Sequence, residues 1–141
     1  MDCIFCKLAN HELDTNMIYE DELVACFLDA YPDSNGHLLI VPKKHTLDLD
    51  TIERETLHHI LDVAKEMKAL LYQKLHCDGV TLIQNNGKVQ EIKHFHLHLK
   101  PYYQQEQRKM EVAEVYQILK SNDYPLLFSI TSSISSLINP F

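Results

Sequence analysis

The sequence lacks long apolar runs. Its 141 residues contain no stretch of about 18 consecutive apolar side chains, the length that a helix needs to cross a bilayer. The first residues, Met1 to Cys6, also lack the basic start and the apolar run of a secretory signal. The sequence therefore predicts a cytoplasmic protein that has no membrane partner.

Positive charge is also scarce. Lys and Arg number 13 against 20 Asp and Glu, which gives a formal net charge of −7. A net-acidic surface repels phosphate backbones, so a nucleic-acid polymer is not expected as a partner. A single nucleotide is still acceptable, because backbone amides, helix N-termini and imidazoles can hold one phosphate locally.

Cysteine is too rare for a disulfide framework. Without a secretory signal, the pair Cys3-x-x-Cys6 is more typical of metal or redox chemistry. Cys26 lies in an apolar run and is expected in the core, whereas Cys77 is expected in a loop. Three further histidines have no partner pattern and are expected at the surface: His11, His58 and His59.

What the chain does have is a regular alternation of apolar segments and polar turns. Apolar stretches at 17–19 and 23–28 predict a hairpin, and residues 37–41 predict a buried strand that Pro42 ends. Two more strands are expected at 80–83 and 92–100.

Helical spacing predicts a long helix from Asp50 to about Leu75 and a shorter one over 110–120. Asp50 is expected to cap the long helix, with Glu53 completing a variant of the capping box, and Gly79 lies near its expected end. The expected apolar stripe comprises Ile52, Leu57, Ile60, Leu61, Ala64, Met67, Leu70 and Leu71.

The run His94-Phe95-His96-Leu97-His98-Leu99 places three histidines on one face of the expected strand and apolar side chains on the other. Three such imidazoles need polar partners or water. A metal-binding strand, a solvent-facing strand and a catalytic strand all satisfy this need on composition alone.

Other polar residues favour a phosphate site around this strand. His37 follows a glycine turn, and Asn85-Asn86-Gly87 precedes the histidine strand, so neutral donors could surround one phosphate. An imidazole is mostly neutral at pH 7 and is then a nucleophile. Attack on phosphorus would give a nucleotidyl-histidine, which water hydrolyses.

The histidine run, the segment 36–45 (Gly-His-Leu-Leu-Ile-Val-Pro-Lys-Lys-His) and Asn-Asn-Gly together resemble the histidine triad (HIT) family over about residues 3–103. The resemblance implies an α+β fold: an antiparallel sheet with a long helix and a shorter C-terminal helix, in a homodimer. It also implies a nucleotide hydrolase or transferase that cleaves a nucleoside phosphoramidate or dinucleoside polyphosphate at the α-phosphate. The HIT domain is expected over 1–122, and residues 123–141 are left as an unassigned tail.

The same resemblance assigns the site residues. His96 is the expected nucleophile, and His98 and His37 flank it and contact the phosphate. Asn85 and Gln90 match residues of the phosphate site. Asp29 is expected to accept the ribose hydroxyls of a purine nucleotide, and the base pocket is expected from Ile4, Phe5, Leu8, Phe27 and Ala30.

One loop departs from the family pattern. The segment between Gly87 and His94 is shorter than usual, and Glu91 stands where several members have a hydroxyl residue. A carboxylate there would repel phosphate, so Glu91 is expected to face outward.

The cysteine pair resembles the zinc-bearing branch of the family, which implies a structural zinc held by Cys3, Cys6, His45 and His94. Two other functions remain open at this stage. One is a non-catalytic protein that senses nucleotides, and the other is a metal hydrolase in which His94, His96 and His98 bind the metal together.

Overall fold

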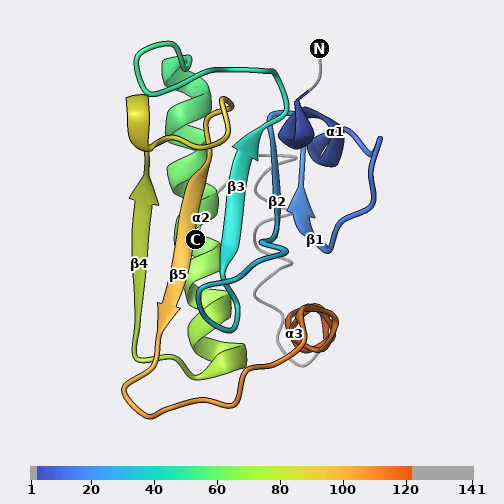
Figure 1. The fold of residues 1–141 in the computed structure, drawn as a ribbon, viewed down its shortest axis with the longest axis vertical. Helices are drawn as coiled ribbons and strands as arrows, with labels where there is room; N and C mark the ends of the chain where they lie inside the picture. The colour runs from blue at the N-terminus through green and yellow to red at the C-terminus, as the bar shows by residue number, and fades with distance from the viewer. Residues whose placement is uncertain (1–2, 122–141) are drawn as a thin grey trace.

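The computed structural model describes residues 3–121. The expected domain boundary at 122 and the tail 123–141 lie outside these residues. Five antiparallel strands form one sheet in the order β1-β2-β3-β5-β4 (Figure 1). The strands are β1 (Met17–Glu20), β2 (Val24–Leu28), β3 (Leu38–Pro42), β4 (Gly79–Gln84) and β5 (Leu97–Tyr102). The helices are α1 (Ile4–Ala9), α2 (Arg54–Leu75) and α3 (Val112–Lys120), and a short 3-10 turn, η1, spans Gly87–Val89. The expected α+β class is confirmed.

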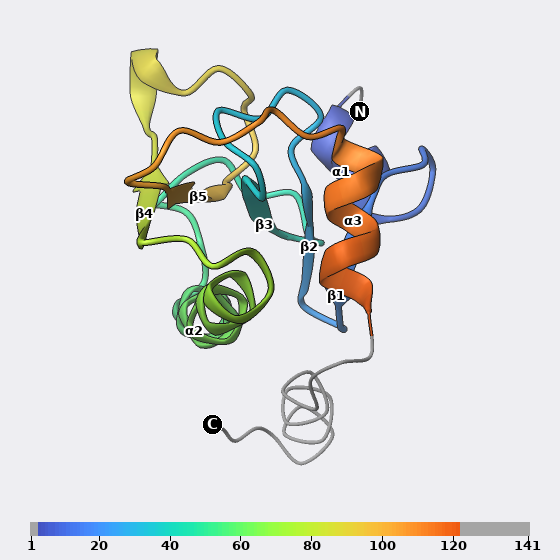
Figure 2. The ribbon, with the colours of Figure 1, turned by 90° about the horizontal axis from the view of Figure 1, so that it is seen from below.

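Helices cover both faces of the sheet. Figure 2 shows α2 beneath one face and α1 beside the other. Alternate side chains of the central strands divide between two cores, since successive strand residues point to opposite faces. Cys26, Ile40 and Leu99 join the core under α2, whereas Phe27 and Leu39 join the smaller core under α1. This burial on both faces explains why every residue of β2 and β3 is buried.

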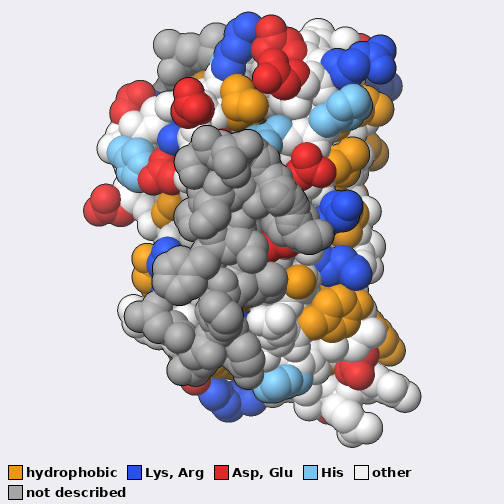
Figure 3. All heavy atoms as spheres, turned by 180° about the vertical axis from the view of Figure 1, so that it is seen from behind, with side chains coloured by type: hydrophobic (Ala, Val, Ile, Leu, Met, Phe, Trp, Pro, Cys, Tyr) orange, Lys and Arg blue, Asp and Glu red, His pale blue; other side chains and the backbone are white. Residues whose placement is uncertain are grey.

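The surface shows neither a membrane span nor a field of one charge. None of the helices within residues 3–121 combines the length and apolar character that a bilayer crossing requires. Seen from behind in Figure 3, the part of that face that the structure describes carries both acidic and basic side chains.

The long helix begins later than expected. Asp50 does not cap it: the Asp48 carboxylate accepts the backbone N–H groups of Asp50 and Thr51, which holds 48–51 in a turn. The helix therefore starts at Arg54, and Glu53 at the cap position makes no side-chain capping bond. Leu61, expected in the apolar stripe, is 44% exposed.

The end of this helix also differs from the expectation. His76, not Gly79, occupies the left-handed cap position, with φ of 55° and its N–H donated to the Tyr72 carbonyl. Gly79 is already the first residue of β4, where it pairs with Tyr102. Cys77 lies in the loop between the two elements, as expected, and its side chain is buried in the core.

Gly36 sits at the turn that leads into His37. Its φ is +94°, and a Cβ there would clash with the Leu75 side chain and approach Leu71 and Pro101 to 3.2 Å. We expect Gly36→Ala to lower the free energy of unfolding by about 2 kcal/mol, because it adds backbone strain to overpacking. Urea denaturation measures this. Gly79→Ala is the control, since its Cβ would come no closer than 3.9 Å to Tyr102; equal losses in both variants would contradict the expectation.

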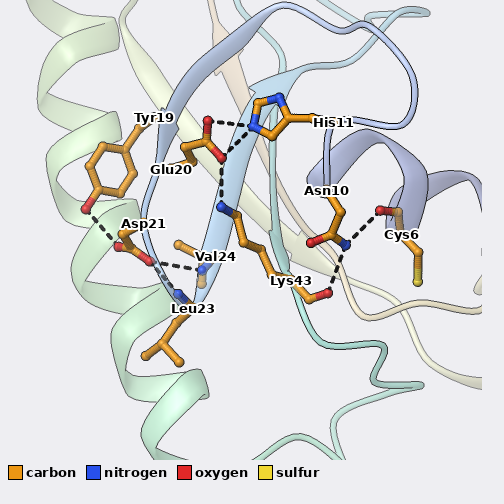
Figure 4. A network of polar contacts seen from close by, with 9 residues as sticks. All are labelled: Cys6, Asn10, His11, Tyr19, Glu20, Asp21, Leu23, Val24 and Lys43. Atoms are coloured by element: carbon orange, nitrogen blue, oxygen red, sulfur yellow. Dashed lines mark hydrogen bonds and ion pairs between the residues drawn. The ribbon is translucent and has the colours of Figure 1, made fainter.

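Two histidines that have no partner pattern in the sequence, and that were expected at the surface, are paired with carboxylates. His11 Nε2 lies 2.8 Å from Glu20 Oε2, and His59 Nε2 lies 2.6 Å from Asp21 Oδ2. Figure 4 shows the contact between His11 and Glu20, and it shows Asp21, which also accepts hydrogen bonds from the Tyr19 hydroxyl and from two backbone N–H groups. The pair His59–Asp21 ties α2 to the β1–β2 turn.

This pair should make stability depend on pH. The bond to Asp21 raises the pKa of His59 above 6.5 against the effect of burial. Burial raises the pKa of Asp21, but the bonds from His59 and Tyr19 outweigh it and hold the pKa below 3.8. The contribution of His59 to the free energy of unfolding is complete at pH values below its pKa in the unfolded chain, and it is lost as pH rises through its pKa in the folded protein. The contribution of Asp21 has the opposite dependence and is lost as pH falls.

We therefore expect His59→Ala to cost about 1–2 kcal/mol at pH 5.5 and less at pH 8.5. Denaturation curves of the variant and the wild type at the two pH values give this difference. His58→Ala, on the exposed side of the same helix, should cost little at either pH. A His59→Ala penalty that grows toward pH 8.5 would contradict the assigned sign.

Candidate active site and metal centre

The sheet brings one histidine of the triad to its α1 face. His98 is the second residue of β5 and pairs with Leu39 and Ile83 in register. Its neighbours Leu97 and Leu99 pack in the core under α2, so alternation places His98 on the opposite face. That part of the expected pattern is confirmed.

The other two triad histidines precede the strand. β5 begins at Leu97 and not at residue 92, because the chain before it bonds elsewhere: the Phe95 N–H is donated to the Thr46 carbonyl, and the His94 N–H to the Ile92 carbonyl. The expected strand over 92–100 is thus wrong in its first half. His96 nevertheless lies against His98, with ring centroids 4.9 Å apart.

A hydrogen bond determines which nitrogen of His96 carries the proton. His96 Nδ1 lies 2.7 Å from the His94 carbonyl oxygen. A carbonyl only accepts, so we assign the proton to Nδ1, and the lone pair of a neutral ring then resides on Nε2. The backbone of one triad histidine therefore orients the ring of the next.

A second set of hydrogen bonds determines which ring nitrogen carries the proton in His37 and in His98. The Asp33 backbone N–H is donated to His37 Nδ1 at 3.1 Å, so a neutral His37 carries its proton on Nε2. This Nε2 lies 2.9 Å from His98 Nδ1 and donates to it. His98 consequently carries its own proton on Nε2, where it is a hydrogen-bond donor.

All three rings are held in the neutral form. Burial lowers the pKa of His37 and of His96. Burial, with the nearby His96 and His37, lowers the pKa of His98 to about 4. At neutral pH the site thus offers one unprotonated nitrogen and neutral N–H donors.

These imidazoles open into a cavity of about 890 Å³, a volume that suits a nucleotide. Among the residues expected in the site, the cavity is lined by His37, His96, His98, Asp29, Asn85, Ile4, Phe5, Leu8, Phe27 and Ala30. Phe5 packs edge-on against His96, with centroids 4.9 Å apart. The aromatic and aliphatic side chains come from α1, β2 and the residues just after β2.

One expectation for the 87–94 loop differs from the structure. Gln90 does not line the cavity; it is buried, and its side-chain amide donates to the Leu47 carbonyl at 2.7 Å. Glu91 is exposed, which agrees with the expectation that it faces outward, and it also borders the cavity together with Val89 and Ile92. The loop therefore contributes to the cavity on both sides of the buried Gln90.

The cavity also has walls that the motifs did not indicate. They include Leu13, Asp14, Thr15, Asn16, Leu28, Tyr31, Asp33, Leu39 and Lys100. Asp33 carries the most weight among them, because its backbone N–H sets the tautomer of His37 and its carboxylate lies 2.7 Å from Lys100 Nζ. The density of turn formers over 30–36 was the only sequence signal for this loop.

Beside the cavity, four ligand atoms converge. Those of Cys3, Cys6, His45 and His94 all lie within 4.8 Å of one another. His94 Nδ1 is 3.3 Å from Cys3 Sγ and 3.4 Å from Cys6 Sγ, and His45 Nδ1 is 3.2 Å from Cys6 Sγ. These separations are close to the roughly 3.5 Å edges of a tetrahedron around zinc.

The protonation states of this cluster also fit zinc. His94 Nε2 lies 2.8 Å from the Pro42 carbonyl and donates to it, so the lone pair is on Nδ1, facing the sulfurs. Burial, with Cys3 beside it, raises the pKa of the Cys6 thiol to about 11. A divalent cation would offset that cost by binding both thiolates.

Polar contacts hold the N-terminal segment that contains Cys3 and Cys6 against the segment that contains His45. Figure 4 shows the Asn10 side-chain amide between two backbone carbonyls, 2.8 Å from that of Cys6 and 3.3 Å from that of Lys43. Lys43 Nζ in turn lies 2.7 Å from Glu20. These bonds fix α1, which carries the cysteines, against the segment that leads to His45.

The geometry does not support a metal shared by the three triad histidines. The Nδ1 lone pair of His94 faces the cysteines, whereas Nδ1 of His96 donates to a carbonyl. Asp29, His37 and His98 also cluster, but His37 Nδ1 already accepts the Asp33 N–H, so Nε2 could bind a metal only as an imidazolate.

Three neighbouring imidazoles that line a nucleotide-sized cavity beside a sheet of this strand order are the arrangement that the resemblance to histidine triad proteins implies. The chain belongs to the HIT domain family, whose sequence model matches residues 10–105.

Relatives and solved structures agree with this assignment. An uncharacterized HIT-like protein of Methanocaldococcus jannaschii is 38% identical over 118 residues, which is 82% of this chain and 91% of that protein. The adenosine 5′-monophosphoramidase of Saccharomyces cerevisiae is 38% identical over 101 residues, 70% of this chain and 61% of that protein. A zinc-bound histidine triad family protein from Mycobacterium smegmatis superposes with a TM-score of 0.79 at 29% identity, covering 98% of this chain and 99% of that one.

Proposed function

We propose that this protein is a nucleotide hydrolase or transferase that cleaves a nucleoside phosphoramidate or dinucleoside polyphosphate at the α-phosphate. The observation that carries the proposal is the Nε2 lone pair of His96, fixed by the His94 carbonyl and open to the cavity. The similarity to the Saccharomyces cerevisiae adenosine 5′-monophosphoramidase supports the phosphoramidate class.

In the first step, His96 Nε2 forms a bond to the α-phosphorus while the bond from phosphorus to the leaving nitrogen or oxygen breaks. The leaving group takes the bonding electron pair and a proton from solvent water, and the water that attacks in the second step returns a proton to the solvent. In the second step, water forms a bond to phosphorus, the P–N bond to His96 breaks, and a nucleoside monophosphate is released.

The neighbouring groups stabilise the charge on the phosphate oxygens. His98 presents Nε2–H because its Nδ1 accepts from His37, and Asn85 contributes a side-chain amide at the same cavity. Both are neutral and are in place before the substrate arrives, which is the arrangement that lowers the barrier of phosphoryl transfer.

For the rest of the nucleotide we propose two further contacts. Asp29 accepts the ribose hydroxyls; its Oδ1 already accepts the Tyr31 N–H, which holds the carboxylate in place. A purine base packs against the apolar wall formed by Ile4, Phe5, Leu8, Phe27 and Ala30. Gln90 has no direct role in this arrangement, since its side chain is used within the loop.

We further propose that zinc at the Cys3/Cys6/His45/His94 cluster is structural, since four protein ligands leave no open position for substrate. The zinc-bound Mycobacterium smegmatis relative supports the choice of metal. A homodimer in the cytoplasm is the setting we expect for the protein.

A substrate panel tests the proposed function. The purified protein is mixed with adenosine 5′-monophosphoramidate, with diadenosine polyphosphates and with an adenylyl sulfate anhydride, and liberated AMP is measured. We expect AMP from at least the phosphoramidate. Tight binding of AMP or GMP with no release from any substrate would overturn the proposal and favour a nucleotide sensor.

A further inference from the structure

Glu91 is an exposed acidic residue that borders the cavity proposed to be catalytic. The connection between β4 and β5 supplies one wall of this cavity through Asn85, Val89, Glu91 and Ile92, whereas the apolar base pocket comes from α1, β2 and the loop after it. Glu91 is therefore on a different wall from the groups proposed to hold the base.

Glu91 shares the cavity with the proposed nucleophile, since both Glu91 and His96 line it. Within residues 3–121, no hydrogen bond or ion pair neutralises the Glu91 carboxylate. A charge at the edge of this cavity acts on charged groups that enter or leave it.

The charge balance of the cavity strengthens this effect. Of the described residues that line it, Lys100 alone is a lysine or arginine, and its ammonium already pairs with Asp33 at 2.7 Å. Asp14 and Asp29 add further carboxylates. An anionic leaving group such as a nucleoside polyphosphate thus meets repulsion, while a cation meets attraction.

We propose that Glu91 selects the leaving group, favouring phosphoramidates of alkylamines that carry a second, positively charged amino group and disfavouring anionic leaving groups. This inference rests on the proposed function and specifies its substrate class. Glu91 acts through charge in this role and forms no bond to phosphorus.

Three AMP phosphoramidates of matched length isolate the charge. Their leaving amines are ethylenediamine, propylamine and glycine, which present an ammonium, a methyl group and a carboxylate at the far end. All three break the same type of P–N bond. Comparing each substrate between wild type and variant removes the differences in intrinsic reactivity.

We expect Glu91→Gln to lower kcat/KM for the ethylenediamine substrate about fivefold to tenfold and to raise it for the glycine substrate by a similar factor. The propylamine substrate should change less than about twofold, and Glu91→Lys should reverse the order of preference. The effects should shrink at high salt, because the site is open to solvent. Glu22→Gln is the control, since Glu22 is exposed in the β1–β2 turn and does not line the cavity.

The outcomes separate the two proposals. If the wild type releases AMP from the substrates but the preference is the same in Glu91→Gln, the leaving-group role is overturned and the proposed function stands. An equal loss on all three substrates would also overturn it, by showing that Glu91 acts on structure. If the wild type cleaves none of the three, the leaving-group role is overturned, and the diadenosine polyphosphates and the adenylyl sulfate of the substrate panel then decide whether the proposed function stands.

Discussion

His96→Ala should abolish turnover, with a loss of about 10⁴-fold in kcat, because removal of a covalent nucleophile leaves only the binding and electrostatic contributions of the site. The binding of AMP should persist, since Asp29, Asn85 and the apolar wall are untouched. AMP release from adenosine 5′-monophosphoramidate and calorimetric titration with AMP measure the two quantities.

Two further variants test whether the loss of activity comes from misfolding instead of from loss of the nucleophile. His96→Asn keeps polar bulk at the buried position and should be as inactive as the alanine variant, with a near-native unfolding curve. His58→Ala, on the exposed surface of α2, should retain full activity. Near wild-type turnover in the folded His96→Asn variant would exclude a covalent mechanism at this residue.

Cys6→Ser should lose the metal and much of the stability. Cys6 contacts both histidines of the cluster, so its loss opens the tetrahedron. A ligand present at about a thousand times its Kd contributes about 4 kcal/mol to the folded state, and a loss of this order is expected. Metal analysis and urea denaturation with and without a chelator check both parts.

If the cluster holds a structural zinc, as proposed, loss of the metal should still lower activity. The carbonyl that orients His96 belongs to His94, whose ring is a ligand of the cluster. Release of that ring therefore loosens the nucleophile. Cys77→Ala, a buried cysteine remote from the cluster, should lose packing energy but keep its zinc; full stability of Cys6→Ser in chelator would contradict a structural role.

The features that the sequence predicted well are those set by short-range periodicity. Alternation placed His98 opposite the core residues Leu97 and Leu99, and the structure confirms it. The hairpin at 17–28 and the strand that ends at Pro42 follow in the same way from apolar runs and turn residues.

Other features depend on contacts that no local pattern records. Asp48 and Asp50 are both reasonable helix caps, and only the observed turn shows that Asp48 takes the backbone N–H groups. Gln90 lies in an irregular loop, where the distant Leu47 carbonyl binds its side-chain amide, and Gln90 is not among the residues that line the cavity. The partner of His59 is 38 residues away, in a different turn.

In the site, too, the sequence predicted some features and could not predict others. The resemblance brought His37, His96 and Asp29 together, and the structure places all three at one cavity. The tautomers could not be predicted, because they are set by the His94 carbonyl and the Asp33 N–H, which are backbone groups. Backbone groups carry no side-chain signature, so the orientation of the nucleophile emerges only from the fold.

The most direct test of covalent catalysis is a rapid quench during turnover. The protein is mixed with adenosine 5′-monophosphoramidate that carries a radioactive α-phosphorus, stopped within milliseconds, digested and analysed by mass spectrometry. The account predicts an adenylyl group on the peptide that contains His96, appearing before AMP and absent from His96→Asn. Steady release of AMP with no label on the protein, or with label on another side chain, would contradict it.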